Sequence, residues 1–289
     1  MIKLVACIMF VLIAAEPSPA GPDYDELLRR ALQYGDTPAR RAEKEAARKE
    51  LDALGADALR AMVDRMHMEN LMLHVVAHEF VERQVPAAEG IPVLRSGLDS
   101  PHEQTRRACA FLLGLYPRDD ESIPRLLRML DVERERNAAL RTLGLWRVEE
   151  AHARARGLLA ADAERTRIAA ANALARFRSR ADIDALLDAL GDSSILVRNA
   201  AARALLEIGA PAKPSVRRAI RRAEGARLRE LIRLAGIWRD RAAKRDLARL
   251  SRHPDPQIRA DARWALSRID RSQPPRDRLV DPQFYGRIR

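Results

Sequence analysis

The chain has 289 residues, of which 47% are hydrophobic, 4% are aromatic and 32% are charged, and its net charge is +11 at pH 7. With this composition the chain can bury a long, thin core rich in alanine and leucine, and the scarcity of aromatic residues argues against one globular core. The excess of basic over acidic residues favours an acidic partner.

The first twenty residues predict an export signal. A short basic start precedes an apolar run from Leu4 to Ala15, and the small residues Ser18 to Ala20 offer a cleavage site before Gly21. The run is shorter than the roughly 20 residues that span a bilayer. We expect residues 1–20 to be removed and the protein to reach the periplasm or to be secreted. A first structural helix and a lipid anchor at Cys7 are the alternatives.

Residues 21–36 are expected to hold one short helix, from Asp23 to Leu32. Acidic residues gather at its start, where they favour the helix dipole.

Residues 37–270 are organised by a recurring arginine. Six arginines follow one another at intervals of 30 or 31 residues, and five of them have leucine seven residues later. A period of about 20 to 50 residues is typical of a solenoid, in which neighbouring units supply one another's core. The six are Arg106, Arg136, Arg167, Arg198, Arg229 and Arg259, and weaker copies place Lys44 and His74 in the same position.

The apolar residues within each unit follow helical spacing. After Arg167, for example, Ala169, Ala170, Ala173 and Leu174 share one face. A second helix is expected in most units, and no alternating run predicts a strand. The second helices should cover residues 91–98, 123–130, 151–159, 183–190, 216–223 and 242–250. The fold class is therefore all-α, a solenoid of about seven to eight helix pairs.

Local signals mark helix ends. Thr37, Ser100 and Asp255 each precede a proline, a pattern that predicts an N-cap followed by the first helical residue. Gly55 and Gly209 are expected to end helices.

The repeats resemble a known family. An aspartate precedes the arginine in three units (Asp131 and Arg136, Asp162 and Arg167, Asp192 and Arg198), and one unit contains the segment VRNAAARALLEIG. With a period near 31, these features resemble HEAT repeats, in particular the short type of the phycobiliprotein lyases. The resemblance implies an armadillo-like superhelix whose second helices line a concave surface. It also implies that Asp–Arg pairs bridge adjacent repeats, which makes the six arginines structural.

Charge is distributed unevenly along the chain. Residues 1–210 have a net charge of −2, whereas residues 211–289 have a net charge of +13. Eight cations fall on the polar faces of two second helices, and the family geometry would place them together as a basic concave patch. They are Arg217, Arg218, Arg221, Arg222, Arg241, Lys244, Arg245 and Arg249. A merely solvated face in an arginine-rich chain is the alternative.

The expected partner is an acidic protein or an anionic envelope polymer, because export makes nucleic acid an improbable ligand. The HEAT-like family includes scaffolds, lyases, hydroxylases and DNA-repair proteins, so the resemblance leaves function open. No membrane span is expected after removal of the signal.

One cluster suggests a metal site without completing it. His74 and His78 lie four residues apart, so both imidazoles can share one helix face. No third ligand is fixed by spacing, and the nearby methionines suit core packing. The His-Glu pairs that some HEAT-like hydroxylases use for iron have no equivalent here, because His78 and His102 occupy different positions in their repeats. We expect no metal and no cofactor.

The sequence contains no recognisable catalytic motif. Cys109 is the only cysteine after residue 20, and its place on an alanine-type position predicts a small buried side chain. The leading hypothesis is an exported, non-enzymatic interaction scaffold. The alternative is an envelope enzyme or a lyase-like protein whose active site has no sequence signature.

Residues 271–289 contain Pro274 and Pro275 and lack helical periodicity. We expect an extended or disordered tail, or one that docks over the last repeat.

Overall fold

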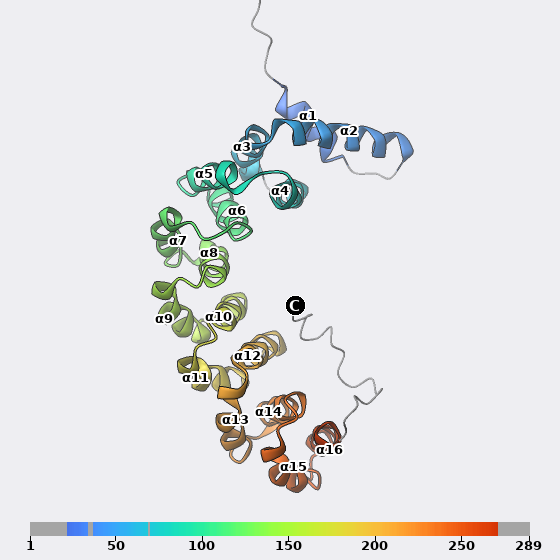
Figure 1. Ribbon diagram of the computed structural model, residues 1–289, viewed down its shortest axis with the longest axis vertical. Coiled ribbons are helices and arrows are strands. Elements are labelled where there is room, and N and C mark those ends of the chain that lie inside the picture. Colours follow the sequence, from blue (N-terminus) through green and yellow to red (C-terminus); the bar gives the residue numbers. More distant parts are fainter. Residues whose placement is uncertain (1–21, 34–36, 69, 271–289) are drawn as a thin grey trace, which may run out of the picture.

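The computed structural model describes residues 22–33, 37–68 and 70–270. These residues form sixteen α-helices and no strand, arranged as a curved double layer (Figure 1). The predicted all-α solenoid is confirmed. The predicted export signal and the predicted C-terminal tail lie outside the described residues.

Six helices form the convex layer of the arc, here called the outer helices (Figure 1). They are short, and several follow a single 3₁₀ turn, such as η2 (Asp120–Ser122) and η4 (Arg180–Asp182). The outer helices are α5 (Ala87–Gly97), α7 (Ile123–Met129), α9 (Glu149–Gly157), α11 (Ile183–Ala189), α13 (Lys213–Ile220) and α15 (Lys244–Leu250).

Six further helices, here called the inner helices, form the concave layer (Figure 1), and from α8 onward each is longer than the outer helices. Each carries one of the six recurring arginines. They are α6 (Glu103–Leu113), α8 (Glu133–Leu145), α10 (Glu164–Phe177), α12 (Ile195–Ile208), α14 (Gly225–Ile237) and α16 (Pro256–Asp270). At the N-terminal end lie α1 (Tyr24–Ala31), α2 (Pro38–Leu54), α3 (Ala56–Arg65) and α4 (Leu71–Arg83).

The phase of the repeat differs from the sequence prediction. From α7 onward, each outer helix packs most closely against the inner helix that follows it, as in α11 with α12 and α15 with α16. The arginine-bearing helix is therefore the second helix of each hairpin, not the first. Second helices do line the concave side, but they are the arginine-bearing ones.

The recurring arginine explains this phase. In Arg106, Arg167, Arg198 and Arg259, Nη1 donates to two carbonyls of the loop before the helix, at 2.7–3.1 Å. The side chain thus satisfies carbonyls of the loop that joins the outer helix to its successor, and it fixes the two helices as one hairpin.

The predicted Asp–Arg pairs are rearranged. Arg167 Nε donates across the repeat boundary to the Asp192 carboxylate at 2.7 Å. Arg198 Nη1 donates only to the backbone carbonyl of Asp192 and not to its carboxylate. Arg106 and Arg229 likewise bond to Glu135 and Asp261 of the next inner helix. Asp131 instead pairs with Arg154. The arginine bridges repeats in these three cases, but its partner is a carboxylate of the following repeat.

Small residues set the curvature. A Cβ added to Gly144 on α8 would lie 2.9 Å from the Cα of Ala173 on α10, and one added to Gly236 on α14 would lie 3.0 Å from the Cα of Ala265 on α16. Inner helices at these points approach almost backbone to backbone, so the array bends toward the inner side. The inner stack is tight from α6 to α12 and looser between α12 and α14.

The core runs between the two layers as one continuous cluster. The repeated leucines Leu113, Leu143, Leu174 and Leu205 are fully buried, as their spacing predicts.

Caps follow the sequence with one exception. Thr37 and Asp255 accept hydrogen bonds from the first turns of α2 and α16, and Gly55 and Gly209 end helices with φ of 53° and 75°. The prediction for Ser100 is wrong, because α6 begins only at Glu103 and Ser100 Oγ accepts from the His102 N–H in the preceding turn.

Candidate functional site

The eight predicted binding cations lie on the outer helices α13 and α15 and the short segments that flank them. These helices form part of the convex layer (Figure 1). The placement of the eight residues in a basic concave patch is therefore wrong. The error follows from the phase of the repeat, since the helices taken as second are the first of their hairpins.

Three of these eight cations are paired with carboxylates. Arg217 Nη1 lies 2.7 Å from Asp240 Oδ2, and Arg221 Nε lies 3.0 Å from Asp246 Oδ2. Lys244 Nζ lies 2.8 Å from Asp270 Oδ1. The first two pairs join α13 to the following repeat. Within the described part of the chain, Arg222, Arg241, Arg245 and Arg249 are exposed and have no ion-pair partner. Arg218 donates to Ser215 Oγ.

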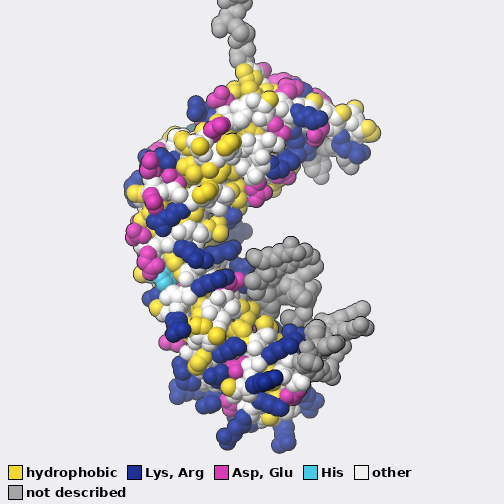
Figure 2. Space-filling model, in the orientation of Figure 1, with side chains coloured by type: hydrophobic (Ala, Val, Ile, Leu, Met, Phe, Trp, Pro, Cys, Tyr) yellow, Lys and Arg dark blue, Asp and Glu magenta, His cyan; other side chains and the backbone are white. Residues whose placement is uncertain are grey.

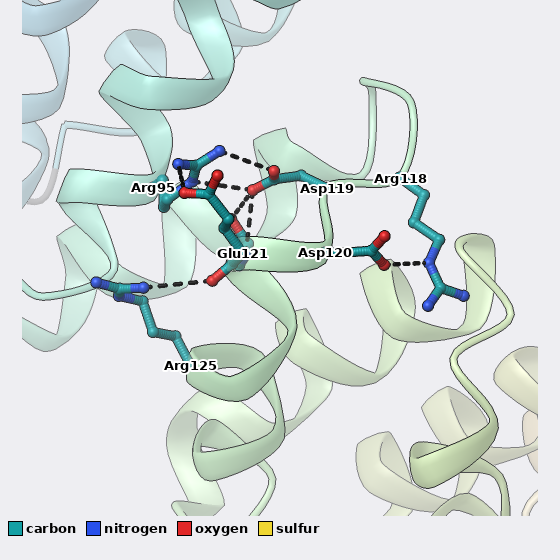
Figure 3. A network of polar contacts seen from close by, with 7 residues as sticks. Arg95, Arg118, Asp119, Asp120, Glu121 and Arg125 are labelled. Carbon is teal, nitrogen blue, oxygen red and sulfur yellow. Dashed lines mark hydrogen bonds and ion pairs between the residues drawn. The ribbon is translucent and has the colours of Figure 1, made fainter.

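Pairing with carboxylates recurs along the outer helices. Figure 3 shows one such network, in which Arg95 of α5 reaches Asp119 at 2.8 Å and also contacts Glu121, both at the start of α7. Arg125 of α7 donates to the Glu121 carbonyl and lies 2.8 Å from Asp99, which follows α5. These arginines hold one outer helix to the next.

A buried network of the same kind lies between α9 and α11. Asp182 is fully buried and accepts from His152 Nε2 and Arg156 Nε, both at 2.8 Å. His152 also contacts Glu149 at 3.0 Å and stacks on Phe177. Burial would lower the pKa of His152, but the hydrogen bonds to Glu149 and Asp182 outweigh it and raise this pKa.

Besides the recurring arginine, which is paired with a carboxylate in several repeats, the inner helices carry three arginines of another kind. They are Arg141 on α8, Arg176 on α10 and Arg203 on α12. Each lies on the face of its helix that is turned away from the core, where the residues at helical spacing are exposed or half-buried. Arg141 Nη1 donates to the Phe111 carbonyl at 3.0 Å, and Arg203 donates to Asn172 Oδ1. No carboxylate within the described ranges forms an ion pair with any of the three.

The positive charge of Arg176 acts on both Arg141 and Arg203. Burial and the charge of Arg176 both lower the pKa of Arg141 and the pKa of Arg203, with Glu82 and Glu207 only partly opposing the effect. Like charges held together without a partner favour an anion at that place. Figure 2 shows Lys and Arg side chains gathering over the part of the arc that α10 to α16 occupy.

A groove of about 500 Å³ lies at the N-terminal edge of this cationic surface, between α4, α6 and α8. Its apolar lining is Ala108, Leu112, Ala138 and the half-exposed Phe111, whose ring lies 3.9 Å below the guanidinium of Arg141. Its polar lining is His74, Gln104, Arg107, Arg134, Asn137 and Arg141.

Sequence reasoning missed this surface. Arg141 and Arg203 both lie five residues after a recurring arginine, and Phe111 and Asn172 occupy the same position in their repeats. The signal was therefore a second periodic row. The net charge of the segment did not reveal this row, because acidic residues on the outer helices cancel the charge of these arginines in the sum.

The predicted metal candidates are not brought into a ligand set. His74 lines the groove, where burial and the charge of Arg107 lower its pKa. His78 lies 3.7 Å from Glu82 and against the ring of Phe111. In the described residues, no three His, Cys, Asp or Glu side chains gather as a metal site would require.

Cys109 is fully buried, as predicted, and burial raises its pKa to about 12. Its sulfur lies where a side chain on Gly97 would fall. Such a thiol is a packing group rather than a nucleophile.

The fold defines an α-solenoid. Residues 133–206 and 155–235 each match the family model for HEAT repeats. The chain carries HEAT repeats over this stretch, as its sequence predicts. A search of curated proteins finds no match.

Several solved structures are similar to this chain at low identity. YibA from Escherichia coli is 14% identical, with coverage of 83% of this chain and 99% of that one and a TM-score of 0.49. The complex of CpcE and CpcF of phycocyanin lyase from Nostoc is 18% identical, with coverage of 89% and 99% and a TM-score of 0.42. Human deoxyhypusine hydroxylase is 17% identical, with coverage of 85% and 96% and a TM-score of 0.35. No statement about function follows from these likenesses.

Among the helices of the described ranges, none combines the length and the apolar character needed to cross a bilayer.

Proposed function

We propose that this chain is a non-enzymatic scaffold that binds an acidic partner protein on its concave face. The observation that carries the proposal is the row formed by Arg141, Arg176 and Arg203, which neighbouring inner helices hold together without a neutralising carboxylate among the described residues. Positive charges that repel one another in the free protein are stabilised when an anion binds beside them, and this relief of repulsion favours binding.

A protein partner fits this surface better than a uniform polyanion. The helices that carry Arg176 and Arg203 also carry half-buried amides, Asn172 and Asn199, and Phe111 adds an exposed aromatic ring. Amides and aromatic rings recognise peptide groups and apolar side chains, which a polyanion of phosphates or sugars largely lacks.

Binding of fluorescein-labelled poly-L-glutamate tests the charge component of the proposal. Fluorescence anisotropy should show binding that weakens steeply from about 0.05 M to about 0.5 M salt. Replacing Arg141, Arg176 and Arg203 together by glutamine should weaken binding by at least about tenfold, or about 1.4 kcal/mol.

A matched set of outer cations supplies the control. Replacing Arg222, Arg241 and Arg245 by glutamine removes the same charge from α13, α15 and their flanks, where the sequence had predicted the site, and should change binding little. If the outer set abolishes binding and the inner set does not, the proposal is wrong. Because Arg176 is exposed and unpaired, Arg176→Glu alone is a second inner variant that should leave the melting temperature unchanged.

We also propose that the scaffold acts outside the cytoplasm, on the basis of the sequence of residues 1–20 alone. N-terminal sequencing of the protein from its native host should begin at Gly21. Recovery of the cytosolic chain with Met1 intact would refute export without affecting the binding proposal.

A further inference from the structure

The groove between α6 and α8 combines three properties: an apolar floor, a cationic border and a buried acceptor that lacks a hydrogen-bond partner. Phe111 is an exposed aromatic residue on the inner helix α6, with 38% of its surface accessible. Its ring is covered on one side by the Arg141 guanidinium, and Ala108, Leu112 and Ala138 extend the apolar floor. The groove can therefore take an apolar side chain of a ligand.

Cations border this apolar floor. Arg107 is exposed, and its nearest carboxylate, Glu103, lies 3.5 Å away and is shared with Arg134, at 3.7 Å. Arg141 has no carboxylate partner in the described chain. Glu103 is thus shared by two guanidinium groups, and Glu82 only partly opposes the charges that act on Arg141. The border of the groove therefore keeps a net positive charge that favours acidic groups on either side of the apolar one.

An unpaired acceptor lies within the lining. Asn137 Oδ1 is buried and has no hydrogen-bond partner. A buried acceptor without a donor destabilises the free protein. Because Asn137 lines the groove, a rotation of its side chain would bring the amide to a ligand, where Oδ1 can accept from a backbone N–H.

We propose that this groove recognises an acidic peptide segment that carries one apolar side chain among its carboxylates. Phe111 and the aliphatic floor hold the apolar side chain, Arg107 and Arg141 bind the neighbouring carboxylates, and Asn137 accepts a peptide N–H. The inference rests on the proposed function and specifies which acidic sequence the concave face selects. Residues 271–289 are a poor occupant, because they carry five arginines against two aspartates.

Two synthetic peptides test this selection with the full mature chain. Both are acetylated and amidated runs of glutamate, one with a central phenylalanine and one with a central serine. The phenylalanine peptide should bind about tenfold more tightly, since burial of the ring adds to the charge attraction. Phe111→Ala should remove this preference and leave the serine peptide unaffected. Ile195→Ala, at a comparably exposed apolar residue of α12, should preserve it.

Asn137→Ala gives a readout that a purely structural role would not produce. It should weaken binding of both peptides several-fold while the melting temperature stays the same or rises, because the unpaired acceptor is gone. Unchanged affinity would remove Asn137 from the site.

The outcomes separate the two proposals. Equal binding of both peptides, insensitive to Phe111→Ala, would overturn the groove and leave the cationic scaffold intact. Failure of both peptides to bind at low salt would overturn the scaffold proposal itself.

Discussion

The two layers of the solenoid place arginine in different surroundings. On the outer helices Arg95, Arg125 and Arg217 face carboxylates of a neighbouring repeat, and each pair joins one helix to the next. On the inner helices Arg141 and Arg176 face one another's charge, and that layer is held instead by close approach of small residues. The comparison teaches that an arginine's partner depends on its position in the repeat. The recurring arginine of several inner helices and many outer arginines are held by carboxylates, whereas Arg141, Arg176 and Arg203 have no ion-pair partner among the described residues, which is why we propose them as the ligand-binding row.

The largest effect should come from the buried outer carboxylate. Asp182→Ala removes the partner of both His152 and Arg156, and breaking a buried charged network typically costs about 3–5 kcal/mol. Urea unfolding followed by circular dichroism measures the loss. The control is Asp131→Ala, whose carboxylate is 72% exposed and pairs with Arg154, so its cost should be at most about 1 kcal/mol. Equal losses would show that burial does not distinguish these outer pairs.

The inner layer should be sensitive to a single methyl group. Gly144→Ala places a Cβ against the backbone of Ala173, and such overpacking costs about 1–3 kcal/mol. Gly157→Ala is the matched change at the end of the outer helix α9, where no atom lies within 4 Å and the backbone is helical. It should be neutral or stabilise by up to about 1 kcal/mol. A tolerated Gly144→Ala would show that the inner helices do not set the curvature.

The pH dependence of stability should reveal His152. Since its pKa is raised in the folded protein, its stabilising contribution is fully present below the unfolded value of about 6.5 and is lost as pH rises through the folded value. The stability difference between wild type and His152→Gln should therefore shrink from pH 5.5 to pH 8. A difference that grows over this range would contradict the assignment of Glu149 and Asp182 as its partners.

The smallest expected effect is a slight gain in stability. Arg176→Gln removes a charge that repels Arg141 and Arg203, so the melting temperature should stay constant or rise slightly, by a few tenths of a kcal/mol in stability. Arg154→Gln, on the outer helix α9, should lower stability by a similar amount because it removes a partner of Asp131. Changes of opposite sign in the free energy of unfolding would support the difference between the layers. A loss of stability in both variants would argue against it.

Much of the fold could be predicted from the sequence, because every stacked repeat must bury the same apolar positions against its neighbours. The positions of Leu113, Leu143, Leu174 and Leu205 repeat with the period, so their burial could be predicted from spacing alone. The phase could not, because the loops on either side of an arginine are similar in length and composition. Only the hydrogen bonds from Arg106 and its equivalents to the preceding loop show which helices form a hairpin.

The site was harder to predict for a related reason. Counting charge located the basic C-terminal third, yet Arg217 and Arg221 of that region are paired with carboxylates more than twenty residues later in the chain. Whether an arginine is neutralised depends on contacts between repeats, which a count of charges does not contain. The row of Arg141 and Arg203 was visible as a periodic position, but its lack of partners was not.

Hydrogen exchange of the full mature chain, with and without saturating poly-L-glutamate, tests the central claim most directly. Binding on the concave face predicts added protection in peptides from α6, α8, α10 and α12 and none in α13 or α15. Protection concentrated in α13 and α15, with α8 and α10 unchanged, would contradict the separation of the layers and return the binding site to the convex side.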